Sequence, residues 1–172
     1  MMKRLMPLLL LLVALCCPSI GHTSENPLLL GNTLRGSSEP TIRLTTSGAV
    51  GTSYSFTIIG GATPIQIDWG DGTLVSPAST MVRGKKAGDE IKIYGECLSF
   101  LAPRAKITAI TIDAPKMGML ALADNELTTL DLSKTPAIVS LNLQGNKLTS
   151  LDLHSLVALS MLNVKLNKLE SL

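Results

Sequence analysis

A 21-residue repeat in residues 117–172 limits what this chain can fold into more than any other feature. The three copies place asparagine at positions 125, 146 and 167, with aliphatic residues at fixed distances on either side. Leu120 and Leu122 of the first copy are two residues apart, so both point to one side of a short strand. Because only about a dozen residues connect successive strands, we expect a parallel sheet joined by turns and extended segments rather than by long helices.

The shared pattern, L-x-x-L-x-L-x-x-N-x-L with a period inside the range of 20–29 residues, is identified as a leucine-rich repeat. This class predicts a β-solenoid with the leucines inside. A buried asparagine amide needs partners, because an unpaired polar group costs about 1–3 kcal/mol. We therefore expect Asn125, Asn146 and Asn167 to bond the backbone of neighbouring coils as a structural ladder, with no catalytic role.

Residues that alternate with the inner leucines are expected on the concave face, where such repeats bind. This predicted face is weakly polar, carries one charge and lacks the Trp, Tyr and Arg side chains that anchor tight interfaces. Binding through these copies alone would be weak. The predicted binding residues are Met119, Ala121, Ala123, Ser140, Asn142, Gln144, Met161, Asn163 and Lys165.

A degenerate earlier copy is expected in residues 98–116. When Phe100 is aligned with Leu120, Ala105 stands where the ladder asparagine would be. Terminal repeats are commonly atypical because they cap the core. We therefore interpret this segment as the cap that joins the repeats to the region before them.

Residues 1–21 have the three parts of a secretory signal peptide. Lys3 and Arg4 form a basic start, the apolar core of Leu8–Leu15 is too short to cross a bilayer, and Gly21 ends a site for cleavage. We expect export to the cell surface or the medium, with no transmembrane span. A lipoprotein anchor at Cys16 or Cys17 stays open as an alternative.

The composition of the chain argues against some classes of partner. The chain is 45% hydrophobic but only 3% aromatic, and its 15 basic and 13 acidic residues become 13 and 13 once Lys3 and Arg4 leave with the signal. A neutral chain has no electrostatic reason to capture nucleic acid or anionic lipid. Cys97 is then the single cysteine, which we interpret as a buried apolar residue. No residue set predicts a metal or cofactor.

A linker over 22–40 precedes a small β region over 41–97. Alternating apolar residues and glycine-rich turns, including one at Gly84, predict a small antiparallel sandwich. The expected strands are 42–46, 54–59, 65–69 and 91–94.

The segment IDWGDGT is the most distinctive part of this region. Asp71 and Gly72 favour a tight hairpin turn, and Trp69 is expected to fill the core. Asp68 and Asp71 could instead hold calcium, but two carboxylates are too few for its six to eight ligands. We favour hydrogen bonds to the turn backbone. The motif resembles the WGDG signature of PKD-like (polycystic kidney disease) domains, which implies an extracellular immunoglobulin-like sandwich without catalysis.

The order of the whole chain resembles the internalin-like, or internalin-related, leucine-rich-repeat surface proteins of Bacteroidetes-type bacteria. The matching parts are the IDWGDGT turn, the IKIYG strand at 91–95 and the LTSLDL-type repeats at 127–132 and 148–153. The resemblance implies exported proteins for adhesion, cell contact or biofilm formation, and no enzyme. The last copy stops before its Asp-Leu step, so we expect either a fragment of a longer protein, which we favour, or a short relative that associates end to end.

Two functions follow as hypotheses. The first is an extracellular interaction module that binds a protein or another cell-surface ligand through the concave face. The second is a carbohydrate-binding or hydrolase accessory module that binds glycan around Trp69, which requires that this indole be exposed.

Overall fold

The computed structural model describes residues 39–170, which form two β-sheets and contain no helix. These residues belong to one compact unit. The signal peptide predicted at 1–21 and most of the linker lie outside the described residues. The first sheet contains β1 Ile42–Thr46, β3 Gln66–Asp68, β4 Leu74–Val75, β6 Glu90–Tyr94 and β8 Ile107–Ile112. The second contains β2 Ser53–Gly60, β5 Met81–Lys85, β7 Cys97–Leu101, β9 Met119–Ala121, β10 Ser140–Asn142 and β11 Met161–Asn163.

The first sheet is antiparallel throughout, in the order β4-β3-β6-β1-β8. Apolar residues alternate along its central strands, so that Ile42, Leu44, Ile91 and Ile93 all lie on the inner side. This is the pattern of a strand with one face on a core. The strands expected from alternation at 42–46, 54–59, 65–69 and 91–94 are confirmed, with shifts of one or two residues at some ends.

One hydrophobic core lies between the two sheets, as in a β-sandwich. Phe56 is its centre: the ring is 5.8 Å from the Trp69 ring and 5.6 Å from the Phe100 ring, measured between centroids. The same buried cluster continues into the interior leucines of the repeat. The few aromatic residues of the chain thus gather in the sandwich, while the repeat is filled with aliphatic side chains.

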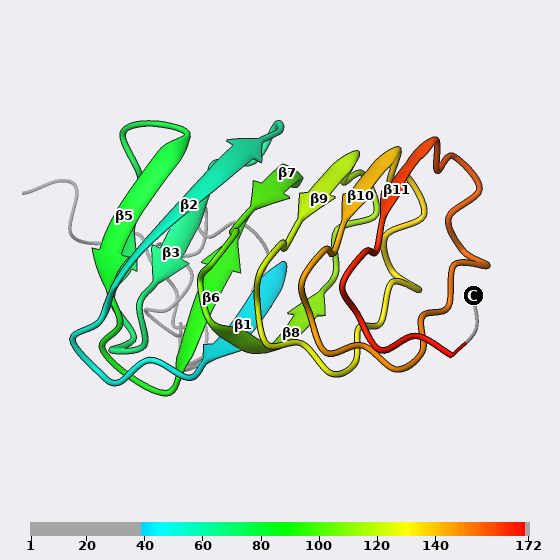
Figure 1. The fold of residues 1–172 in the computed structure, drawn as a ribbon. Helices are drawn as coiled ribbons and strands as arrows, with labels where there is room; N and C mark the ends of the chain where they lie inside the picture. The colour runs from blue at the N-terminus through cyan, green and yellow to red at the C-terminus, as the bar shows by residue number, and fades with distance from the viewer. Residues whose placement is uncertain (1–38, 171–172) are drawn as a thin grey trace, which may run out of the picture. The chain divides into compact units, whose positions relative to one another are not determined.

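The second sheet is continuous from the sandwich into the repeat, in the order β11-β10-β9-β7-β2-β5 (Figure 1). β7 is the joining strand, because it pairs antiparallel with β2 and parallel with β9. Phe100 lies opposite Leu120 in that parallel pair, which is the alignment expected for the degenerate copy. The segment 98–116 also includes β8 of the other sheet, so the predicted cap contributes to both.

Two details of the β region differ from expectation. Gly84 does not mark a turn but lies inside β5, opposite Tyr54 of β2. A side chain there would overlap Trp69, since a β-carbon on Gly84 would lie 2.1 Å from the indole ring. The IDWGDGT turn is also longer than a two-residue hairpin, because residues 69–73 connect β3 and β4. Its positive φ angles fall on Gly70 and Gly72 rather than on an Asp-Gly pair.

Candidate functional site

The predicted asparagine ladder has a repeated hydrogen-bond geometry. The backbone N–H of Leu127 donates to Asn146 Oδ1 at 3.1 Å, and Asn146 Nδ2 donates to the carbonyls of Leu122 at 2.8 Å and Leu143 at 3.0 Å. Each amide therefore bonds its own coil and the coil before it. In the same way, the backbone N–H of Ile107 donates to Asn125 Oδ1, and the backbone N–H of Leu148 donates to Asn167 Oδ1. These side chains are occupied by backbone groups, as expected for a structural role.

A left-handed residue precedes each ladder position. The φ angles are 55° at Asp124, 69° at Gly145 and 57° at Leu166. Arg104 has the same conformation, at 55°, directly before Ala105. The segment predicted as a degenerate copy thus has a left-handed residue at the matching position, although it lacks the asparagine.

The three short strands β9, β10 and β11 pair in parallel and in register (Figure 1). Their central residues are Leu120, Leu141 and Leu162, and the first two are fully buried. The nine predicted binding residues lie on the other side, so the structure brings them together. One row consists of Met119, Ser140 and Met161. A second row consists of Ala121, Asn142 and Asn163. Backbone bonds beyond the strands align Ala123, Gln144 and Lys165 as a third.

This outward face of β9–β11 carries little charge. Lys165 is its only ionisable side chain among the nine, and Asn163 Nδ2 donates to Gln144 Oε1 at 2.9 Å. Asn142 Oδ1 accepts the backbone N–H of Gln144 at 3.2 Å. These nine residues include no paired acid and base, and their chemistry is that of contact and hydrogen bonding.

In the IDWGDGT turn both carboxylates accept backbone hydrogen bonds. Asp68 Oδ1 accepts the N–H of Gly70 at 2.7 Å and that of Gly72 at 2.9 Å, and Asp71 Oδ1 accepts the N–H of Thr73 at 2.9 Å. Asp68 is buried. No group of three or more His, Cys, Asp or Glu that could hold a metal exists within the described part of the chain. These contacts support the structural interpretation of the turn over the calcium alternative.

Trp69 is buried and only 8% of its surface is exposed. One side of the ring stacks on Phe56, and Gly84 of β5 contacts the indole as well. The glycan hypothesis requires an exposed Trp69 ring. Because the ring is buried, the glycan hypothesis lacks the exposed aromatic surface that it requires.

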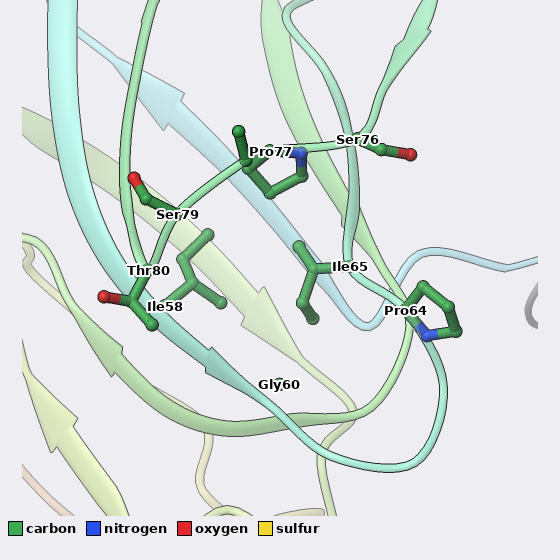
Figure 2. Close-up of a pocket in the computed structure, with 9 residues that line it drawn as sticks. Ile58, Gly60, Pro64, Ile65, Ser76, Pro77, Ser79 and Thr80 are labelled. Carbon is green, nitrogen blue, oxygen red and sulfur yellow. The ribbon is translucent and has the colours of Figure 1, made fainter.

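Hollows on the β region offer contact surfaces of a different kind. One, of about 410 Å³, lies over β2 and β5, where Ser53, Tyr54 and Arg83 are among its lining residues. Another, of about 380 Å³, lies beside the β4–β5 loop (Figure 2). Ile65 and Pro77 line it together with small and hydroxyl residues, and none of its lining residues is ionisable. Neither hollow was predicted from the sequence, and the second offers apolar contact without an acid or a base.

Cys97 lies at a third hollow, of about 230 Å³, which Glu96 and Lys116 also line. Burial raises the pKa of the Cys97 thiol to about 12, while its hydrogen bond to the Ser99 carbonyl acts in the opposite direction. A thiol with so high a pKa is protonated at neutral pH and is a poor nucleophile. The interpretation of Cys97 as a buried apolar residue is therefore consistent with the structure.

None of the protein-family models, curated proteins or solved structures that we compared with this chain matches it. Within residues 39–170, no helix is long and apolar enough to cross a membrane.

Proposed function

We propose that this chain is an exported leucine-rich-repeat protein of the bacterial surface, which binds a protein or another cell-surface ligand in adhesion. One observation carries the proposal. The side of β9–β11 opposite the buried leucines presents nine residues in three aligned rows. Such a surface suits contact with a partner, and the nine residues form no constellation for catalysis, so the proposal includes no enzymatic activity.

The repeat assignment within this proposal is supported by the hydrogen bonds. Each 21-residue unit contributes one short parallel strand, one left-handed residue and one asparagine that bonds the previous coil. A unit that buries its leucines only against its neighbours is the physical basis of a solenoid. The PKD-like assignment of the β region is likewise part of the proposal, supported by two sheets around Phe56 and Trp69.

The test places two carboxylates on the proposed binding face. Ser140→Asp with Asn142→Asp adds charge at half-buried positions, and an aspartate at 142 retains an oxygen for the N–H of Gln144. The matched control, Thr149→Asp with Ser150→Asp, adds the same charge to the same coil at exposed positions. Labelled protein is titrated onto cultured bacterial cells and, separately, epithelial cells.

We expect the face variant to bind at least one cell type about tenfold more weakly than the control, because the two added carboxylates must lose water when a partner covers them. Equal binding by the two folded variants would exclude this face. Export is tested separately by N-terminal sequencing of protein from the medium, which should begin at His22. Recovery only inside the cell, with Met1 retained, would contradict export.

A further inference from the structure

The outward face of β9–β11 does not end at the repeat. Pairing register continues it across β7 to β2 and β5, so residues of the sandwich lie in the same rows as the predicted binding residues. One row runs through Met81, Thr57, Leu101, Ala121, Asn142 and Asn163. The next runs through Ile59, Ser99, Met119, Ser140 and Met161. We call this surface the six-strand face.

Large apolar side chains are exposed on four of the six strands of this face. Ile59, Met81, Met119 and Met161 are each between 39% and 56% exposed, and they come from four different strands. In β2, β5 and β9 the adjacent residue is buried and fills the interior, so the exposed side chains do not serve the core. Exposed apolar residues that gather on one surface mark an interaction site. Methionine suits such a site because its flexible thioether adapts to a partner.

The charged residues of the six-strand face all have the same sign. Arg83 and Lys85 lie on β5 at one end, opposite Ser55 and Ser53, and Lys165 lies at the other end just beyond β11. Arg83 lies along the face, with Nη2 3.4 Å from the Met81 sulfur. Asp124, in the turn that follows Ala123, has its carboxylate beside Gly145. Over residues 39–170 this face is therefore apolar in its centre and cationic on β5 and just beyond β11.

This distribution of apolar and cationic side chains indicates which kind of partner the face can bind. Two copies of the chain that met face to face would bring cationic ends together in either orientation, which is unfavourable. A different protein with carboxylates on both sides of an apolar centre would be complementary to each part of the surface. Electrostatic complementarity of this kind mainly sets specificity and the rate of association.

We propose that the six-strand face is one continuous docking surface, shared by the sandwich and the repeat, for a protein segment with an apolar centre and acidic ends. The inference rests on the proposed function and extends it: the β region supplies half of the binding surface, and the partner is acidic.

The probes are two fluorescein-labelled peptides with the same central run of leucine and methionine. One has glutamates at both ends and the other has lysines. Fluorescence anisotropy with the full chain should give about tenfold tighter binding of the glutamate peptide, and the difference should shrink as salt is added. Equal or tighter binding of the lysine peptide, or no binding of either, would overturn the acidic partner.

Three variants locate the surface. Met81→Asp with Arg83→Glu changes the sandwich half, and Ser140→Asp with Asn142→Asp changes the repeat half. Val157→Asp with Lys92→Glu makes the same charge change as the first pair, at an exposed residue outside the strands and at a residue of β6 in the other sheet. Trp69 fluorescence checks that each variant is folded. We expect both face variants, but not the control, to bind the glutamate peptide about tenfold more weakly than the unchanged protein does.

The same variants, applied to the cell assay, separate the two proposals. If the repeat variant loses binding and the sandwich variant does not, the six-strand surface is wrong while the proposed function stands. If neither loses binding, both proposals fail. Loss of binding in both variants supports the shared surface.

Discussion

The indole ring of Trp69 lies against the α-carbon of Gly84, and a β-carbon at that position would come within 2.1 Å of the ring. The ring cannot move away easily, because its other contacts include the Phe56 ring at 5.8 Å. Trp69, the only tryptophan of the chain, therefore favours glycine at position 84 of β5. This contact makes Gly84 a structural requirement of the sandwich.

Replacement of Gly84 by alanine should therefore destabilise the protein by about 1–3 kcal/mol, the usual cost of overpacking a filled core. Gly118→Ala is the control, since a β-carbon there meets only the Leu98 carbonyl at 4.0 Å. Urea unfolding followed by Trp69 fluorescence measures both. Equal stability of the two variants would show that the ring moves aside freely.

Loss of a ladder amide should cost more than loss of an outward amide. Asn146→Ala leaves the backbone N–H of Leu127 without its partner, and a buried unsatisfied group costs about 1–3 kcal/mol. The Leu143 carbonyl also loses a bond but keeps the one from Asn167 Nδ2. Asn142→Ala removes only a local bond to Gln144 at a half-buried site and should cost less than about 1 kcal/mol. Denaturant midpoints decide the order, and an equal loss in both would argue against a structural ladder.

The interior leucines should differ in their contribution along the repeat. Leu141 is 1% exposed, so Leu141→Ala should cost about 2–5 kcal/mol through lost contacts and a cavity. Leu162 occupies the equivalent position but is 40% exposed, and Leu162→Ala should cost less than half as much. Thermal unfolding of the two variants tests this difference. A larger loss at Leu162 would mean that its coil is covered in solution.

Glu126 should make stability depend on pH. Hydrogen bonds from Ser47 and then Lys147 hold the pKa of its carboxyl below the ordinary 4.5. A carboxyl whose pKa is lower in the folded protein stabilises it above the unfolded pKa, and this contribution is lost as pH falls through the folded pKa.

The unfolding temperature of Glu126→Gln should accordingly lie below that of the unchanged protein at pH 7, and the difference should shrink below about pH 4.5. Glu170→Gln, a change at an exposed glutamate, provides the control. A constant difference across this pH range would show that the charge of Glu126 does not contribute.

Local patterns predicted a large part of the fold. Alternation located four strands of the sandwich, and the repeat pattern alone aligned Phe100 with Leu120, its partner in the parallel pair of β7 and β9. β4, β5 and β8 were not predicted. β4 has only two residues, and β5 contains a glycine that is typical of a turn. The residues of β8 match positions 127–132 of the repeat, which form no strand. The nine face residues lie in the rows that their spacing suggests, but the continuation of these rows onto β2 and β5 was not predicted.

Residue spacing alone predicts the 21-residue period, the short parallel strands and the position of each ladder asparagine. These depend on residue spacing within one coil and on the need of a buried amide for partners. The antiparallel and parallel pairing of β7 in one sheet, and the row that Met81 shares with Asn163, follow from long-range strand pairing and are visible only in the folded chain. Pairing of distant strands is made by backbone groups that nearly every residue has, so no single residue marks it in the sequence.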